Sequence, residues 1–474
     1  MRLKPPSFRV SLFAGILLIM AAAVWMVFKP GGADALTAWK AAQEKQGEVF
    51  DLVTLTAAFS AEALAHEARF SNAVKRLVLR PSGPGEFDAM QAAGLGRARV
   101  AWQQPWPIEK RREITSWDEV AVQMATNAVV FGELRELLEH LPAGSARDYH
   151  QGIGVMAHPL ILKRQAGQML AAAVISDLRR GAVGEAREKI HTLLLLGRWH
   201  EDEGMLVDHM IRVALLSLAT SVTWEALQAP GWNEVPLAAL QADLEAASTW
   251  RKLPRTLAVE RAFVLSGFEM ARTNAPTATA WLPGSTRAAG SVAQSFNESI
   301  YTPIWQKAWS AQDELVYLKS IEMLFESYRD ADRARSYQVF KLGIEQRARA
   351  MKARQGLFNR WRFPLSEVAQ PAWAKAGLSL MRAESMREMA RAATAIARHR
   401  LRHDAEPESL QAMVPEFLRD VPWDFMDGKP LRYRRHERRR FSLWSVGEDG
   451  RDDGGKGVGD DLIWPEPAAA GRTP

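Results

Sequence analysis

The stretch that decides the fold is ILKRQAGQMLAAAVISDLRRGAVGEAREKIHTLLLLGRWHE, residues 161–201. Its apolar residues recur at intervals of three and four on both sides of Gly181, which is the spacing of one helical face. They are Leu162, Ala166, Met169, Leu170, Ala173 and Val174 in the first half, and Val183, Ala186, Ile190, Leu193 and Leu194 in the second. Because a glycine between two such runs lets the chain reverse, the stretch predicts two antiparallel helices joined by a short turn.

The helical period continues through most of residues 36–352. The segment GMLVDHMIRVALLSLATSVTWEALQ, residues 204–228, is apolar around most of its circumference, so we expect it to be a central helix. Further helices are expected at residues 237–247, 257–271 and 303–352, and from residue 372. Residues 272–299 lose the period and gather Pro, Gly, Ser and Thr, which predicts a long loop. No repeat of fixed length recurs, so we expect an irregular stack of antiparallel helix pairs.

Composition restricts the chemistry that is available. The chain has 474 residues, enough for two or three domains, and a formal net charge of +6. This modest charge requires no anionic partner, and we expect no nucleic acid to bind. The absence of cysteine excludes disulfides, thiolate catalysis and Cys-ligated zinc, and it fits a protein of the cell envelope.

The N-terminus predicts a membrane anchor. Residues 10–28 are free of charge, and as a helix they would be roughly 28 Å long, close to the ~30 Å hydrocarbon core of a bilayer. Residues 1–9 carry Arg2, Lys4 and Arg9, whereas Lys29 alone follows the span, which places the N-terminus in the cytoplasm. We therefore expect a single-pass protein of the bacterial inner membrane, in contact with lipid, with its bulk in the periplasm. Cleavage of a signal peptide after Ala35 is the alternative.

The C-terminal part differs in composition from the helical body at residues 36–371. In residues 372–465 a long helix is followed by LRYRR and FSLWS, two runs that alternate as strands do, with RRHERRR at the hairpin tip. Next comes EDGRDDGGKGVGDD, residues 448–461, which places six carboxylates in fourteen residues. Residues 466–474 are expected to be a disordered tail. The fold class is thus mainly α, with an N-terminal transmembrane helix and a small C-terminal α+β module.

The order of these elements resembles the globular part of the major pseudopilin of type II secretion systems. The elements that match are the helix MREMARAATAIARHRLRH, the segment EPESLQAMVPEFLRDVPWDFMDGKPLRYRR and the loop FSLWSVGEDGRDDGGKGVGDDLIW. The resemblance covers about 90 residues. It implies a pseudopilin-like module and one bound calcium ion, and it suggests association with a secretion or pilus-like system. Calcium takes six to eight oxygen ligands, which clustered carboxylates separated by glycines can supply.

The resemblance also assigns the calcium ligands. Asp449 matches the aspartate of the family's Gly-x-Asp-Gly, and Asp460 or Asp461 matches the acid before its closing aliphatic residue. Leu443 and Ser445 stand where main-chain carbonyls serve as ligands in the family. Asp452 and Asp453 fall in the variable middle of the loop, where they either add a ligand or only solvate it.

Other features of the chain differ from that family. The N-terminus lacks the Gly-Phe processing site and the glutamate that a pilin-like subunit needs, so we do not expect a filament subunit. The helical body resembles uncharacterised membrane-anchored bacterial envelope proteins, which implies an architecture and no activity. We therefore expect an interaction or scaffold protein with protein partners in the envelope. The alternative is an extracytoplasmic enzyme acting on envelope polymers, with its site in the helical body.

No catalytic motif stands out, so no catalytic residue is predicted and the chain is expected not to be an enzyme. His399 and His403 have the i, i+4 spacing of a metal pair, but arginines surround them and no third ligand is evident. The run HEDEG, residues 200–204, lacks the HExxH pattern and is interpreted as the polar end of a helix. Neither a phosphate-binding glycine loop nor a Gly-x-Ser-x-Gly motif is found.

Overall fold

The chain forms two compact units, which we describe separately. The computed structural model describes residues 32–78, 93–94, 97–105, 107–110, 113–155, 158–274, 295–353, 362–369, 373–437, 440–455 and 461–467. Unit 1 comprises residues 1–52, 261–323 and 348–371, and unit 2 comprises residues 53–260, 324–347 and 372–474. The predicted membrane span at residues 10–28 lies outside the described residues, and so does most of the predicted loop at residues 272–299.

The chain is mainly helical, as the sequence predicts. In unit 2 the helices are α4 (Ala61–Lys75), α5 (Trp117–Thr126), α6 (Ala128–Glu139), α7 (Leu160–Arg179), α8 (Val183–Arg198), α9 (Leu206–Leu227), α10 (Glu234–Ala246) and α19 (Trp373–His403). Unit 1 contains α2 (Ala33–Glu44), α14 (Thr302–Ile304), α18 (Pro364–Val368) and the π-helical turns Asn297–Tyr301 and Trp305–Trp309. The helices α3 (Leu52–Leu55), α11 (Leu253–Thr273), α15 (Ser310–Ala334) and α16 (Tyr337–Ala353) contribute residues to both units.

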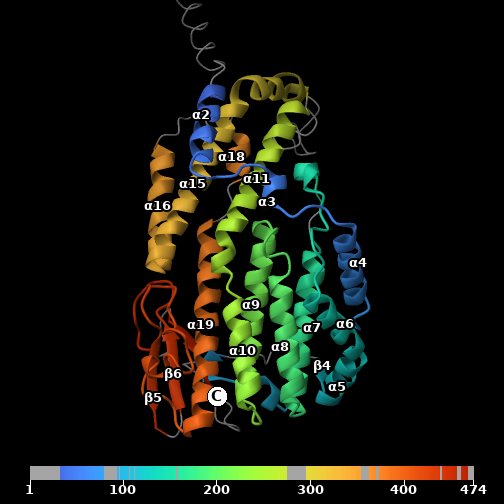
Figure 1. Cartoon of the computed structure of the whole chain (residues 1–474), viewed down its shortest axis with the longest axis vertical. Coiled ribbons are helices and arrows are strands. Elements are labelled where there is room, and N and C mark those ends of the chain that lie inside the picture. The colour runs from blue at the N-terminus through green and yellow to red at the C-terminus, as the bar shows by residue number, and fades with distance from the viewer. Residues whose placement is uncertain are drawn as a thin grey trace, which may run out of the picture. The chain divides into compact units, whose positions relative to one another are not determined.

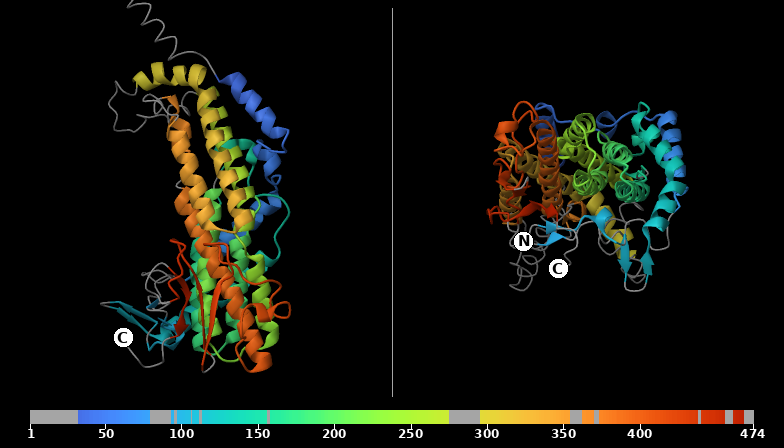
Figure 2. Two further views of the ribbon diagram at one scale, coloured as in Figure 1. Left: turned by 90° about the vertical axis from the view of Figure 1, so that its left-hand side faces the viewer. Right: turned by 90° about the horizontal axis from the view of Figure 1, so that it is seen from below.

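The core of unit 2 is a helical bundle around α9. Helices α7 and α8 form the predicted pair, and α9 packs against both of them and against α19 (Figures 1 and 2). Helix α7 approaches α9 so closely that a Cβ at Gly167 would lie 2.3 Å from Cδ2 of Leu215. Ala219 and Val222 of α9 are fully buried. Such close packing of apolar faces supplies most of the stability of a helical unit.

Helix α9 is also long and apolar enough to cross a membrane, judged by its length and composition alone. Among the described residues it is the one helix with this property, and 56% of its most apolar 18-residue stretch is buried inside the protein. Enclosure by α7, α8 and α19 accounts for that hydropathy, because a helix that is apolar all round is suited to the centre of a bundle. This position confirms the central helix expected at residues 204–228.

A small antiparallel sheet near the C-terminus is also confirmed. Its strands are β5 (Arg432–His436), β6 (Arg440–Ser445) and β7 (Leu462–Trp464), with β6 in the middle. There are two further small sheets among the described residues. In one, β2 (Arg97–Ala98) lies between β1 (Ala93–Gly94) and β8 (Glu466–Pro467). In the other, β3 (Ile108–Lys110) pairs with β4 (Glu113–Thr115). Residues 372–474 belong to unit 2 together with much of the helical body, whereas the sequence suggested a separate module there.

In unit 1 a buried aspartate joins helix α15 to helix α18. The Asp313 carboxylate accepts the N–H groups of Leu365 and Ser366 at 3.1 and 2.9 Å, and Nε1 of Trp305 at 2.9 Å. These N–H groups belong to the first turn of α18, where no intrahelical partner exists. Burial raises the pKa of Asp313 to about 6.

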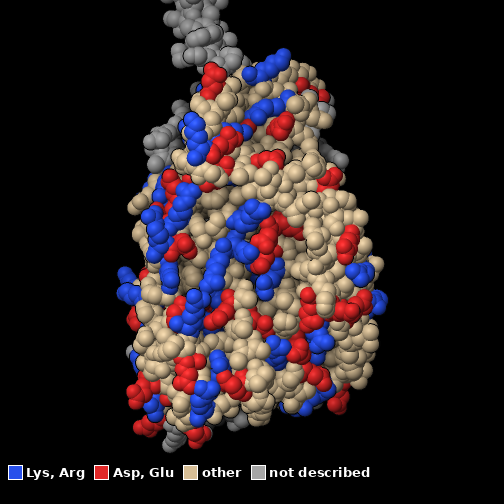
Figure 3. All heavy atoms as spheres, in the orientation of Figure 1, with Lys and Arg blue, Asp and Glu red and all other residues tan. Residues whose placement is uncertain are grey.

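Charged side chains of both signs are interspersed over the face drawn in Figure 3. Within unit 2, Arg135 pairs with Glu188 at 3.3 Å, and both side chains are exposed. Exposed pairs of this kind contribute little to stability, about 0–1 kcal/mol each.

Candidate metal centre beside a polar cavity

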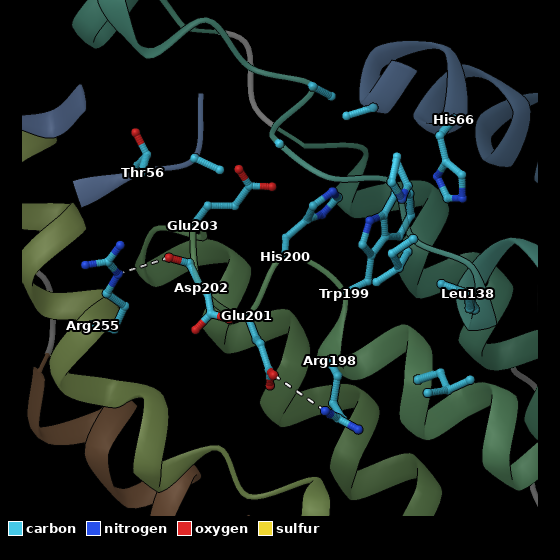
Figure 4. A pocket seen from close by; sticks show the side chains of 17 residues that line it. Thr56, His66, Leu138, Arg198, Trp199, His200, Glu201, Asp202, Glu203 and Arg255 are labelled. Atoms are coloured by element: carbon cyan, nitrogen blue, oxygen red, sulfur yellow. Dashed lines mark hydrogen bonds and ion pairs between the residues drawn. The ribbon is translucent and has the colours of Figure 1, made fainter. Parts of the chain in front are cut away.

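Unit 2 contains a cavity of about 450 Å³ at the end of helix α8. The run of residues 198–203 lies along it, and the remaining wall comes from the start of α4, the end of α6, the turn before residue 149 and helix α11 (Figure 4). The lining side chains with ionisable groups are His66, Arg198, His200, Glu201, Asp202, Glu203 and Arg255. A concave site of this size that gathers polar groups is the usual location of a ligand.

The turn after α8 adopts an unusual backbone conformation. His200 has a φ of +67°, in the left-handed region that non-glycine residues rarely occupy and that costs roughly 1–2 kcal/mol. Several groups hold the turn in place. Lys163 donates from Nζ to the carbonyl of Trp199 at 2.8 Å, and Tyr149 donates from its hydroxyl to the carbonyl of Glu203 at 3.2 Å. Strain supported in this way is typical of functional sites.

His200 meets two side chains that are distant in sequence, Glu67 of α4 and His158 just before α7. Oε2 of Glu67 lies 3.4 Å from Nδ1 of His158 and 3.7 Å from Nε2 of His200. The three ligand atoms all lie within 4.8 Å of one another. The two imidazoles stack with centroids 3.8 Å apart, and His200 stacks on Trp199 at 4.2 Å. We call Glu67, His158 and His200 the triad.

The surroundings of the triad set the charge states of Glu67 and His200. Burial raises the pKa of Glu67, but hydrogen bonds from His158 and Arg147 outweigh it, and the pKa lies below its usual range. Burial, assisted by the positive charge of neighbours such as Lys163, lowers the pKa of His200 far below 6.5. Glu67 is therefore an anion and His200 a neutral imidazole at pH 7, which are the states that bind metal.

A network of hydrogen bonds without metal accounts for only part of this arrangement. Arg147 donates from Nη2 to Oε1 of Glu67 at 2.6 Å, and His158 contacts the other oxygen. His200 is different, because its side chain is 5% exposed, its Nδ1 has no hydrogen-bond partner among the described residues, and its Nε2 comes no closer than 3.7 Å to Glu67. A buried imidazole without hydrogen bonds is costly, so the site suits an additional bound group.

Glu203 adds a second carboxylate near the triad. It is 9% exposed, and its Oε2 is buried without a hydrogen-bond partner in the described part of the chain. Burial raises the pKa of Glu203, and a hydrogen bond with Ser145 offsets only part of this effect. Glu203 lines the cavity together with His200 (Figure 4). Two carboxylates with opposite pKa shifts in one place are typical of acid–base sites.

In the described first part of the predicted calcium loop, residues 448–455, aspartates accept hydrogen bonds from nearby N–H groups. Asp449 is exposed, and its Oδ1 accepts the N–H of Arg451 at 3.0 Å. Asp452 is also exposed, and its Oδ1 accepts Nε1 of Trp444 at 2.8 Å and the N–H of Gly454 at 2.9 Å. Aspartate side chains commonly bond to nearby N–H groups in turns of this kind.

The end of that loop brings acidic groups together. Oδ2 of Asp461 accepts the N–H of Gly455 at 2.9 Å, and its Oδ1 is buried without a partner among the described residues. Burial first, and then the like charges of Asp453 and Asp452, raise the pKa of Asp461. Asp460 lies outside the described residues.

The two predicted carbonyl ligands lie in the sheet. Leu443 is buried in β6 between Tyr433 of β5 and Trp464 of β7. Ser445 donates its hydroxyl to Oδ1 of Asp424 at 2.6 Å. Asp424 also accepts the N–H of Val446 at 2.9 Å, so this buried carboxylate connects the end of β6 to the preceding turn.

The histidine pair on α19 forms no site with a third acid or histidine among the described residues. His399 bonds through Nδ1 to the carbonyl of Ala405 at 2.8 Å, and both rings pack on Phe417. The interpretation of residues 200–204 as only a polar helix end is incomplete, because His200 belongs to the triad.

Sequence reasoning did not identify Glu67, His158 or Arg147. Glu67 stands next to His66 in AHEARF, and His158 stands alone before Pro159. No local spacing connects Glu67 with His158, since the two are 91 residues apart. No family model, curated protein or solved structure matches this chain.

Proposed function

We propose that unit 2 binds one divalent transition-metal ion at Glu67, His158 and His200. The observation that carries this proposal is the approach of two imidazole nitrogens to the same carboxylate oxygen, at 3.4 and 3.7 Å. Ligands about 2.1 Å from a tetrahedral zinc ion lie about 3.4 Å from one another, so the spacing suits such an ion. The two imidazole rings, which stack with an interplanar angle of 20°, would have to tilt apart for both nitrogens to face one ion.

The donor set indicates which metals fit. Two imidazoles and one carboxylate suit zinc and its first-row neighbours, whereas calcium and magnesium prefer oxygen ligands alone. Three protein ligands leave a fourth position for water, which is the arrangement of catalytic zinc sites, while structural sites are closed by four protein ligands. Arg147 would act as an outer partner that orients Glu67.

The cavity supports the hypothesis of an enzyme better than that of a scaffold protein. A scaffold surface needs no enclosed group of acids and histidines, whereas residues 198–203 supply one within a concave wall. We therefore place an extracytoplasmic enzyme ahead of an interaction protein. The location in the periplasm, held by residues 10–28, is part of the same proposal and rests on the sequence.

Metal binding can be measured directly on the purified chain. After chelation and reloading with zinc, we expect about one ion per chain, and Co²⁺ in its place should give the visible absorption of a tetrahedral site. Zinc should raise the melting temperature, because a ligand of the native state stabilises it. Failure of folded protein to retain zinc or cobalt would contradict the proposal.

Matched variants locate the ion. His158→Ala and Glu67→Gln should each weaken zinc binding about 100-fold or more, since a ligand is lost. The exposed His150→Ala and Glu62→Gln, the latter on the same helix as Glu67, should leave binding unchanged. Equal affinities for all four variants would mean that the ion binds elsewhere.

Calcium binding by the C-terminal loop is a second candidate function. The observation that favours it is Oδ1 of Asp461, a buried carboxylate oxygen without a hydrogen-bond partner among the described residues. Its neighbours Asp452 and Asp453 carry like charge that a cation would offset. The ligands would be those that the pseudopilin resemblance implies.

A further inference from the structure

We propose that the cavity binds an ester or amide that carries a carboxylate, and that Glu203 transfers the proton during its hydrolysis. This inference rests on metal binding by the triad. It goes further in naming the substrate class and the residue that moves the proton.

The position of Glu203 supports this role. Its carboxylate is nine-tenths buried, lines the cavity and leaves Oε2 without a partner in the described part of the chain. A buried carboxylate oxygen that no protein group satisfies is suited to a water or a substrate atom inside the cavity. His200 belongs to both the triad and the cavity wall, so an ion held by His200 would adjoin the same space.

The hydrolytic step balances with the groups present. An ion held by Glu67, His158 and His200 would act as a Lewis acid and make a water in the cavity more acidic. Glu203 would take the proton from that water, whose oxygen then forms a bond to the carbonyl carbon of the substrate. The carbon–oxygen or carbon–nitrogen bond then breaks, and Glu203 returns the proton to the leaving oxygen or nitrogen. The products are a carboxylic acid and an alcohol or amine, and no oxidant or reductant takes part.

Arg255 indicates that the substrate carries a negative charge. It lines the cavity from helix α11, and its Nε donates to the main-chain carbonyl of Asp202 at 3.2 Å (Figure 4). The carboxylate of Asp202 pairs with Lys252 instead, at 2.6 Å. The guanidinium of Arg255 therefore has no carboxylate partner among the described residues. It can form bidentate hydrogen bonds with a carboxylate of the substrate.

The test uses the full zinc-loaded chain with two esters that differ only in charge, 4-acetoxybenzoate and its methyl ester. We expect hydrolysis of 4-acetoxybenzoate above the rate of free zinc, measured by chromatography of the phenol product. Glu203→Gln should keep one zinc ion per chain and lose about 100-fold or more in kcat, the usual contribution of a general base. The exposed Glu136→Gln is the matched control and should retain the wild-type rate.

Arg255→Gln tests the substrate class separately. It should raise KM about tenfold for 4-acetoxybenzoate, equivalent to one lost charge pair, and leave KM for the methyl ester unchanged. Zinc-loaded protein that hydrolyses neither ester faster than free zinc overturns the inference while leaving metal binding intact. So does a Glu203→Gln variant as active as wild type. Protein that binds no zinc overturns both proposals.

Discussion

Arg147 and Glu67 form a buried ion pair, with Nη2 of the guanidinium 2.6 Å from Oε1 of the carboxylate. The two side chains are 8% and 11% exposed. Removing one partner of a buried pair leaves the other charge uncompensated, which costs more than the pair itself contributes. The pair thus holds Glu67 in its charged form beside two histidines, and both the stability of unit 2 and its affinity for metal depend on it.

Replacement of Arg147 by leucine should destabilise the metal-free chain by about 3–5 kcal/mol, because Glu67 then remains buried without its cation. Urea unfolding measures this loss. Zinc should recover part of it, since the ion replaces the missing positive charge. Arg135→Leu removes an exposed pair with Glu188 and should change stability by only about 0.5 kcal/mol or less. A loss for Arg147→Leu as small as this control would show that Glu67 is already compensated.

Because Glu225 has a raised pKa, its contribution to the free energy of unfolding should decrease as pH rises. This carboxyl group accepts the N–H of Ala101 at 3.0 and 3.1 Å, and burial raises its pKa to about 9. The unfolded chain loses the same proton near pH 4.3. The contribution of Glu225 is therefore complete below about pH 4.3 and is lost as pH rises toward 9.

Glu225→Gln keeps an acceptor oxygen and removes the titration. The free energy of unfolding of the variant should fall less steeply than that of wild type between pH 5 and pH 8.5, measured by urea unfolding. The difference between the two proteins should grow with pH in favour of the variant. Parallel curves would contradict the raised pKa.

The calcium prediction is tested by thermal melting of the fragment from residue 36 onward, with calcium and with chelator. Calcium should raise the melting temperature of the wild-type fragment through binding to the native state. Asp449→Ala combined with Asp460→Ala should abolish that increase, whereas Glu437→Ala at the exposed hairpin tip should keep it. If calcium changes nothing in wild type, the loop is an acidic turn without an ion.

Anchoring of the full-length chain is tested by extraction of membranes with alkaline carbonate. If residues 10–28 cross the bilayer as the sequence predicts, the full-length protein should stay in the pellet. Deletion of residues 1–35 should release the protein into the soluble fraction. Release of the full-length protein in a shortened form would mean that a signal peptide is cleaved after Ala35.

The sequence by itself determined the helical architecture of unit 2 and the C-terminal hairpin. The runs on either side of Gly181 became α7 and α8, and residues 204–228 became the central helix α9. The alternation in LRYRR and FSLWS became β5 and β6. These features follow from local periodicity, because a repeat of 3.6 or 2 places apolar side chains on one face whatever the rest of the chain does.

Only the tertiary structure decided the triad and its cavity. Glu67, His158 and His200 come from three segments that no local spacing connects, and they meet because α4, α7 and α8 pack together. The histidine pair at 399 and 403, which has the better local spacing, instead packs on Phe417. Burial and neighbouring groups also decided the charge states. The pKa of Glu67 is lowered beside His158 and Arg147, whereas burial raises the pKa of Glu225, for which no cation acts among the described residues.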